Sequence, residues 1–451
     1  MGDKSMGKRQ YNDTKHKVLR FLDKMDVKAI VSILAMELGM FLFVAYKGYA
    51  SFYFPVTVVL MAFSVIGCGF VFATQADKYL LTVILILLNM GFMVQQIQAG
   101  ASMQMLPFLL KFMVAIVTAV AVAAVYQHFA DLLARDFMIL ILMEIQIAVS
   151  AVMLAFGQVV GDSEQSAAIS LLHGVTPFEI VKILYVLVAA GLLCKPEKRT
   201  IAVGRLMVDR QVLLVIHTAV LAVFFILCSE LGTLLIVLFS GLLLLWAYGE
   251  NRKLSTALLL LSVSGFLVFW FVCDKVLYSM LLQEAITLPD VVKKVVLRFG
   301  TALHPEKAMA DSGYQGTLGL EALSLGGLFG ISSEKYRLKL PEASNDYAFA
   351  NVVQTCGMLM GMLMLLSFIA LLRRGIKIAD QCEDSYFQGL AAEITFMISV
   401  ETVVHIGYNI GFLPITGIPL FFVSQGFTAV ITGMALISIL LVVSQKNRKG
   451  W

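Results

Sequence analysis

The chain has 451 residues, of which 59% are hydrophobic and only 14% are charged, and its mean hydropathy is +0.87. Soluble domains contain about half apolar and a quarter charged residues, so this composition excludes an ordinary soluble protein. The formal net charge of +4 is small for this length, and we expect no nucleic-acid partner. The lipid bilayer is the expected surrounding of most of the sequence.

Apolar runs recur from one end of the chain to the other, and many are long enough to cross a hydrocarbon core of about 30 Å. They predict an all-α polytopic membrane protein with about twelve transmembrane helices. The expected spans are 27–46, 53–73, 79–98, 106–127, 137–157, 177–194, 212–228, 231–248, 255–279, 352–372, 388–411 and 420–444. The two spans that flank Glu230 leave room for only a very tight turn.

Lysine and arginine are distributed unevenly among the connecting segments. The first 26 residues are basic and polar, which is typical of a cytoplasmic tail and not of a cleavable signal peptide. With the expected spans, the basic segments 195–210, 250–253, 373–377 and 445–449 all fall on the side of this tail. Cytoplasmic loops carry the excess of Lys and Arg, so both termini are predicted to be cytoplasmic.

One large loop, 280–350, then lies on the extracytoplasmic side. Its first part places Lys293, Lys294 and Arg298 among valines and leucines, which predicts a helix lying in the membrane interface. Short apolar pieces between glycines follow, and they indicate interfacial or re-entrant structure. The predicted segments are a cytoplasmic basic tail (1–26), N-terminal transmembrane helices (27–157), a transmembrane core (158–279), the extracytoplasmic loop (280–350), C-terminal transmembrane helices (351–444) and a cytoplasmic tail (445–451).

Ionisable residues inside the predicted spans cost a few kcal/mol each to insert, so each is a candidate functional residue. Glu179 and Lys182 are three residues apart, on one helix face, where they can neutralise each other. They form either a structural ion pair or part of a site. Glu401 and His405 are four residues apart on another helix. Two ligands are weak evidence for a metal site, and a satisfied polar core is the alternative.

Asp346 lies outside the spans, at the extracytoplasmic lip, in the stretch LPEASNDYAFA (340–350). A carboxylate at a partly dry rim has its pKa raised by desolvation, which suits a general base. An Asp just ahead of a helix is also a common N-cap, whose side chain accepts hydrogen bonds from the first N–H groups. The residues alone leave both interpretations open.

Five segments, in order along the chain, resemble motifs of the SEDS family (shape, elongation, division and sporulation). They are VTPFEIVKIL (175–184), SELGTLL (229–235), SGYQGTLGLEALSLGGLFG (312–330), LPEASNDYAFA (340–350) and HIGYNIGFLPITGIPLFFVSQG (405–426). The resemblance implies a SEDS-type core of about ten helices, preceded here by two additional N-terminal ones.

SEDS proteins are peptidoglycan glycosyltransferases of the bacterial cytoplasmic membrane, which polymerise lipid II during division, elongation or sporulation. The resemblance implies that Asp346 is the catalytic base and that a class B penicillin-binding transpeptidase is the partner. The implied substrate-binding residues are Glu179, Lys182, Glu230, Arg337, Lys339, Pro341 and Glu342. A divalent cation, Mg²⁺ or Mn²⁺, is the candidate cofactor, and no residue is assigned as a metal ligand.

The sequence also departs from the family pattern. Gln354 and Thr355 stand where the family has a Glu-Glu pair, His405 replaces an Asn, and an Arg-Trp before VTPFEIVKIL is missing. The alternative function is therefore a catalytically degenerate paralogue that acts as a scaffold or activator of the transpeptidase. A flippase for lipid-linked precursors is a third interpretation, which no internal inverted repeat supports.

Overall fold

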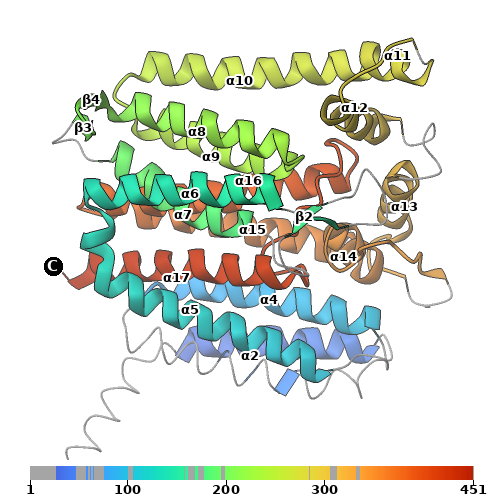
Figure 1. Ribbon diagram of the computed structural model, residues 1–451. Coiled ribbons are helices and arrows are strands. Elements are labelled where there is room, and N and C mark those ends of the chain that lie inside the picture. Colours follow the sequence, from blue (N-terminus) through green and yellow to red (C-terminus); the bar gives the residue numbers. More distant parts are fainter. Residues whose placement is uncertain are drawn as a thin grey trace, which may run out of the picture.

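The computed structural model is a bundle of long helices that run nearly parallel to one another (Figure 1). It describes residues 27–46, 57–58, 61, 64, 76–99, 105–156, 158–160, 168–170, 177–194, 199–283, 285–304, 312–331 and 336–449. The long helices are α2 (Val27–Tyr46), α4 (Lys78–Ala99), α5 (Met105–Leu133), α6 (Asp136–Phe156), α7 (Phe178–Leu193), α8 (Arg210–Leu227), α9 (Leu231–Tyr248), α10 (Arg252–Val272), α15 (Met358–Asp380), α16 (Ser385–Asn409) and α17 (Phe427–Lys449).

The length and composition of these helices confirm an all-α polytopic membrane protein. Within the described part, nine stretches are long and apolar enough to cross a membrane. One of them continues from α10 through a π-helical turn, η2 (Cys273–Leu277), into the short helix α11 (Tyr278–Leu282). The tight turn expected at Glu230 is confirmed, since α8 ends at Leu227 and α9 begins at Leu231.

Three predicted spans need comment. The span expected at 53–73 lies almost entirely outside the described residues. The spans expected at 352–372 and 420–444 begin too early, because α15 begins at Met358 and α17 at Phe427. Residues 352–356 belong to the separate short helix α14 (Ala348–Cys356), and 420–423 form a buried apolar turn, so hydropathy does not separate either stretch from the helix that follows.

Two short antiparallel hairpins add strands to the all-helical prediction. Strands β1 (Gln158–Val160) and β2 (Ala168–Ser170) pair with each other, as do β3 (Thr200–Val203) and β4 (Leu206–Asp209). The β3–β4 connection is a two-residue turn in which Gly204 has φ +61°. Such turns require positive φ values, which glycine adopts without steric cost.

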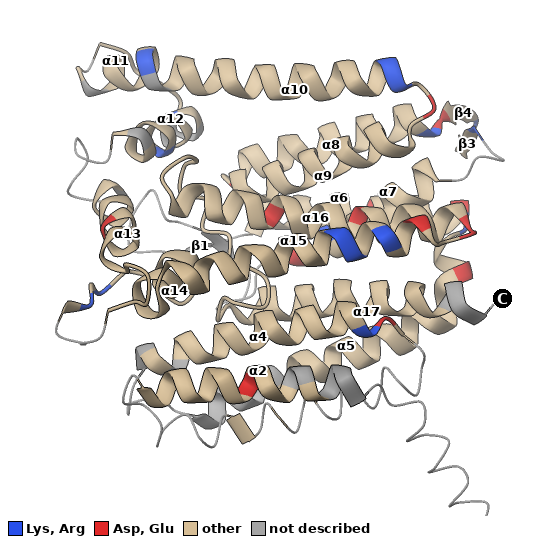
Figure 2. Cartoon of the chain, turned by 180° about the vertical axis from the view of Figure 1, so that it is seen from behind, with Lys and Arg blue, Asp and Glu red and all other residues tan. Residues whose placement is uncertain are grey.

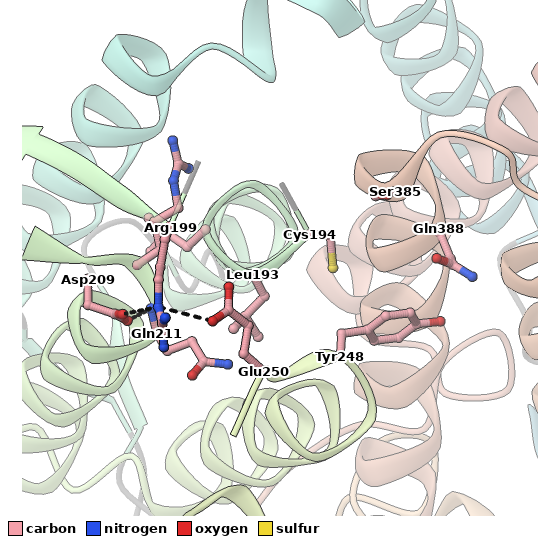
Figure 3. Close-up of a pocket in the computed structure, with 11 residues that line it drawn as sticks. Leu193, Cys194, Arg199, Asp209, Gln211, Tyr248, Glu250, Ser385 and Gln388 are labelled. Carbon is pink, nitrogen blue, oxygen red and sulfur yellow. Dashed lines mark hydrogen bonds and ion pairs between the residues drawn. The ribbon is translucent and has the colours of Figure 1, made fainter. Parts of the chain in front are cut away.

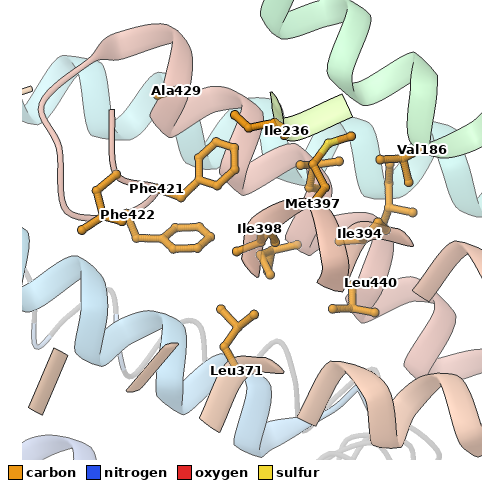
Figure 4. Packing of buried hydrophobic residues seen from close by; sticks show 14 of the residues in the cluster. Val186, Ile236, Leu371, Ile394, Met397, Ile398, Phe421, Phe422, Ala429 and Leu440 are labelled. Atoms are coloured by element: carbon orange, nitrogen blue, oxygen red, sulfur yellow. The ribbon is translucent and has the colours of Figure 1, made fainter. Parts of the chain in front are cut away.

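Helix α16 is at the centre of the bundle and contacts α7, α9, α15 and α17. Figure 4 shows apolar side chains from these helices, and from the segment between α16 and α17, meeting around α16. They include Val186, Ile236, Leu371, Ile394, Met397, Ile398, Phe421, Phe422 and Leu440. Polar side chains on α16 are therefore held inside protein and not against lipid.

The connecting elements gather at the two ends of the bundle. The β3–β4 hairpin, the start of α10 and the C-terminus lie at one end (Figure 1). The short helices α12 (Asp290–Leu303), α13 (Ser312–Leu325) and α14 (Ala348–Cys356) lie at the other. Figure 2 shows basic residues at the start of α10 and just beyond its end, in η2, and none between them, as expected for a membrane-crossing helix.

A close contact between two backbone segments separates α14 from α15. A Cβ on Gly330 would lie 2.2 Å from the Thr355 carbonyl oxygen, and one on Gly357 would lie 2.2 Å from that of Leu328. Gly357 also has φ +92°, a value that residues with a side chain rarely adopt. Met358 N donates to Gly327 O at 2.8 Å across this contact. The break allows α14 to be a separate short helix beneath the segment that carries Asp346.

Candidate active site

Residues 341–347 form the turn that leads into α14. The Glu342 carbonyl closes it by accepting hydrogen bonds from Asn345 N at 2.9 Å and Tyr347 N at 3.2 Å. Glu342 has φ +46°, which is uncommon for a residue with a side chain. The Tyr347 ring is buried, and a Cβ on Gly319 of α13 would lie 2.5 Å from it. The turn is therefore packed tightly against α13.

The Asp346 side chain does not cap α14. Tyr347 occupies the N-cap position, and no side-chain cap bond is formed from it. The Asp346 carboxylate makes no hydrogen bond or ion pair with any residue that the structure describes. It lies beside Gly417, where a Cβ would be 3.7 Å from Asp346 Oδ2. The structure therefore gives no support to the N-cap interpretation.

Asn409, at the C-terminal end of α16, supplies a cap to α14 instead. Its Oδ1 accepts a hydrogen bond from Ala350 N, in the first turn of α14, at 3.0 Å. Its Nδ2 donates to the carbonyls of Asp346 and His405, each at 2.9 Å. Only this orientation of the amide satisfies all three bonds, because the oxygen accepts and the nitrogen donates. Sequence reasoning missed Asn409, since no local pattern connects it with α14.

The two carbonyls before Asp346 are held by the segment between α16 and α17. Gln425 N donates to Ser344 O at 2.8 Å, and Ser424 Oγ donates to Asn345 O at 2.9 Å. Three successive carbonyls, 344–346, are thus bonded from outside the turn, while the Asp346 carboxylate has no hydrogen-bond partner among the described residues. A fixed backbone beneath an available side chain is the preorganisation that a reactive group needs.

The environment of Asp346 suits a base that works near neutral pH. Burial raises the pKa of Asp346 from its ordinary value of 3.8 to about 7, and the negative charge of Glu342 contributes in the same direction. A base is most effective when its pKa lies near the working pH. The sequence-based expectation of a raised pKa at this position agrees with the structure.

A buried ionic triad lies deeper in the bundle. Lys182 Nζ is 2.8 Å from Glu179 Oε1, as the spacing of three predicted, and 2.9 Å from Glu401 Oε2. The Lys182 ammonium also lies 5.1 Å from the ring centroid of Phe421. Glu401 is fully buried and Lys182 is 1% exposed. Sequence analysis identified Glu401 as a candidate, but not as the second partner of Lys182.

Polar residues at a spacing of four connect this triad with the Asp346 segment along α16. Glu401 bonds Lys182, His405 Nδ1 lies 2.7 Å from Ile418 O, and Asn409 bonds the Asp346 carbonyl. Eight residues of α-helix rise about 12 Å, so the triad lies about that far from the Asn409 cap. Glu401 and His405 thus have separate partners. The described residues contain no group of three or more His, Cys, Asp or Glu that could hold a metal ion.

Glu230 lies in the turn between α8 and α9, beside α12. Arg298 of α12 donates to Ser229 O at 3.1 Å, and the charge of Glu230 raises the pKa of the Arg298 guanidinium against the opposing effect of burial. The helix predicted for this part of the loop is present as α12, and Arg298 attaches it to this turn. A Cβ on Gly232 would lie 2.1 Å from Ile418, so the same turn packs against the segment that follows α16.

The remaining predicted site residues are not joined to Asp346 by any contact within the described part. Arg337 Nη1 donates to Ile97 O at 3.2 Å, near the C-terminal end of α4, where a cation is favourable. Lys339 is exposed and Pro341 is partly buried at the start of the turn. Both precede Asp346 by only a few residues, and Lys339 forms no ion pair with a described residue.

A separate hollow of about 210 Å³ lies near the β3–β4 hairpin (Figure 3), which is at the end of the bundle opposite α14 (Figure 1). Arg199 crosses its edge, with its Nε 3.6 Å from Asp209 Oδ2 and 3.1 Å from Glu250 Oε2. Leu193, Cys194, Tyr248 and Gln388 also line it. The hollow is therefore not part of the candidate active site, which lies beside α14.

Comparison with known proteins places most of this chain in one family. A family model described as "Cell cycle protein" (FTSW_RODA_SPOVE) matches residues 71–449. Stage V sporulation protein E of Bacillus subtilis is 36% identical over 156 residues, which cover 34% of this chain and 43% of that protein. Peptidoglycan glycosyltransferase MrdB of Escherichia coli is 27% identical over 276 residues, covering 59% of this chain and 67% of that protein.

Solved structures share the fold. One is described as "Structural coordination of polymerization and crosslinking by a peptidoglycan synthase complex"; it has a TM-score of 0.61 and 19% identity, and covers 83% of this chain and 99% of that one. The rod shape determining protein RodA of Thermus thermophilus has a TM-score of 0.54 and 18% identity, covering 83% and 98%. The sequence alignment with a probable peptidoglycan glycosyltransferase FtsW of Coxiella burnetii, at 31% identity, covers 48% of this chain and 59% of that relative.

Proposed function

The chain belongs to the SEDS family of cell-cycle proteins, and we propose that it polymerises lipid II into glycan strands with Asp346 as the general base. The observation that carries this proposal is the state of Asp346. Its backbone is bonded by Asn409, its carboxylate has no described partner, and burial raises its pKa to about 7. Structural acids are normally engaged in hydrogen bonds or ion pairs, whereas a base must be free to meet its substrate.

In the proposed reaction the Asp346 carboxylate takes the proton from the 4-hydroxyl of the acceptor GlcNAc. The freed oxygen attacks C1 of the donor MurNAc, and the bond from C1 to undecaprenyl pyrophosphate breaks. The electron pair of that bond leaves with the pyrophosphate. The negative charge of the leaving group calls for nearby cations or N–H donors.

Three cations are candidates for contact with the pyrophosphate. Lys339 is exposed and free of described ion pairs, which makes it the most accessible. Arg337 would have to exchange its bond to Ile97 O. Lys182 would meet the pyrophosphate only if this group entered the bundle by about 12 Å, the rise between Glu401 and Asn409. We therefore assign Lys339 the first contact and Lys182 a role in holding the interior.

A divalent cation remains a proposal, and no residue of the chain is assigned to it. Mg²⁺ usually keeps several waters and is held by one or two carboxylates together with substrate phosphates. Such an ion would arrive with the pyrophosphate and offset part of its charge. The pyrophosphate of the lipid-linked substrate, together with water, would thus supply most of the ligands of the cation.

We further propose that the end bearing α12–α14 faces the outside of the bacterial cytoplasmic membrane, with both termini in the cytoplasm. The basic segments near β3–β4 and at the end of α17 support this orientation, because cytoplasmic loops carry the excess of Lys and Arg. A class B penicillin-binding transpeptidase is the proposed partner. The related structure described as a peptidoglycan synthase complex couples polymerization with crosslinking, which supports this choice.

The test is polymerisation of purified lipid II by the full chain with its transpeptidase, with Mg²⁺ or Mn²⁺ present, beside Asp346→Asn. Asn keeps a hydrogen-bonding group but cannot accept the proton. Glycan strands from the parent and none from the folded variant would support the proposal. No product from either protein, in a complex that remains intact on a sizing column, would favour the scaffold function. Equal activity of both would remove Asp346 from the mechanism.

A further inference from the structure

Asn409 does more than join two helices, if Asp346 is the base of the proposed function. We propose that Asn409 is a positioning residue, which keeps the Asp346 carboxylate available for its substrate by capping α14 in its place. Two observations carry this inference: the bonds of the Asn409 amide, and the absence of any described partner for the carboxylate that precedes the same helix.

The first turn of an α-helix has N–H groups without partners inside the helix. An Asp at the N-cap is a favoured acceptor for them, and the start of a helix shifts readily by a residue. Asp346 lies two residues before the first residue of α14 and is the carboxylate nearest to that end along the chain. Local preference would therefore turn its side chain toward the helix, where it could not reach an acceptor hydroxyl.

Asn409 prevents this by making two bonds at once. Its Oδ1 satisfies Ala350 N at 3.0 Å, and its Nδ2 holds the Asp346 carbonyl at 2.9 Å. Asn409 is 1% exposed and Ala350 is fully buried, so these bonds are shielded from bulk water. A third bond, from Nδ2 to His405 O at 2.9 Å, fixes the amide on the last turn of α16. The cap thus comes from α16 and not from the turn that carries the proposed base.

Loss of the cap has a consequence for titration that loss of packing alone does not have. A carboxylate that accepts backbone N–H bonds has a lowered pKa. Glu342 in the same turn is the titratable group that acts on the pKa of Asp346, and the titratable groups on which Asp346 itself acts are Tyr347, next in the chain, and Tyr408 of α16. The segment 413–426 contains no charged residue. None of these groups changes in Asn409→Ala, so a downward shift would report the new bonds of Asp346.

The first experiment compares steady-state polymerisation by the parent, Asn409→Ala and Ser424→Ala across pH. Asn409→Ala is expected to lower kcat by about tenfold or more at nearly unchanged KM. It should also move the acid limb of the rate profile to lower pH by about one unit. Ser424→Ala is the matched control, because it removes the neighbouring bond to Asn345 O but leaves the α14 cap. Its acid limb should stay at the position of the parent.

The second experiment measures the Asp346 carboxyl directly, by its infrared stretching band, with Asp346→Asn as the subtraction reference. A lower titration midpoint in Asn409→Ala than in the parent supports the inference, and an unchanged midpoint overturns it. This readout does not need activity, so an inactive parent with a shifted midpoint would reject the proposed function alone. If Asn409→Ala fails to fold, Asn409→Asp keeps the acceptor for Ala350 N, and its Asp346 midpoint should not fall below the parent value. A fall would overturn the inference.

Discussion

Replacing Lys182 with Met removes the only cation of the buried triad while keeping a chain of similar length. Lys182 Nζ bonds Glu179 at 2.8 Å and Glu401 at 2.9 Å. Breaking a buried ion pair from one side costs about 3–5 kcal/mol, because the remaining charge is left uncompensated. Glu401 is fully buried, whereas 13% of the Glu179 side chain is exposed and can be hydrated. We therefore expect the free energy of unfolding to fall by about 3–5 kcal/mol, mainly through Glu401.

The assay is denaturant unfolding of the purified protein in detergent, with two double variants as controls. Lys182→Met with Glu401→Gln removes the stranded buried charge and should recover most of the loss. Lys182→Met with Glu179→Gln should recover less, since Glu401 remains charged. A single variant within about 1 kcal/mol of the parent, the range of a surface ion pair, would refute this reasoning. Better recovery through Glu179→Gln would contradict the assignment of the cost to Glu401.

Three further predictions concern the active-site end. Asp346→Asn should reduce polymerisation by about 10²–10⁴-fold, the contribution of a general base. It should change the free energy of unfolding by no more than about 0.5 kcal/mol, because the Asp346 carboxylate has no described partner. A large loss of stability would indicate a structural acid. Gly357→Ala should lower the free energy of unfolding by more than about 1 kcal/mol, since Gly357 has φ +92° and a Cβ there would lie 2.2 Å from Leu328 O. Gly265→Ala is the control and should not have this effect, because Gly265 has open space around it. Equal denaturation curves for the two variants would contradict the close contact. Chelation with EDTA should reduce polymerisation, and adding Mg²⁺ or Mn²⁺ should restore it. The unfolding of the substrate-free protein should not change. Full activity in EDTA would contradict the proposed role of a divalent cation.

The sequence could predict the features that depend on local pattern. Apolar runs located the long helices, because crossing a membrane requires a minimum length of apolar residues. The spacing of Glu179 and Lys182 predicted their contact, since residues three apart share a helix face. The raised pKa of Asp346 followed from its place at the edge of an apolar segment. Each of these depends on residues close together in the chain.

The structure adds contacts between residues far apart in the chain. Glu401 lies 219 residues from Lys182, and Asn409 lies 59 residues from Ala350. No periodicity or capping pattern links such pairs, so the sequence could offer Asp346 only as base or cap. In the structure Asn409 of α16 caps α14, so Asp346 does not have the role of the cap. The early starts predicted for α15 and α17 have a related cause, because a buried short helix (α14) and a buried apolar turn (420–423) resemble a membrane helix in composition.

The pH dependence of lipid II polymerisation by the parent protein tests the central claim most directly. A single base whose pKa is raised to about 7 must lose its proton before it can act, so the rate should rise with pH and level off above neutrality. Below the midpoint the rate should change by about tenfold per pH unit, and Asp346→Asn should abolish this limb. A rate that stays flat from about pH 5 to about pH 8, across the expected midpoint, would contradict the assignment of Asp346 as the base. The same acid limb in Asp346→Asn would contradict it as well.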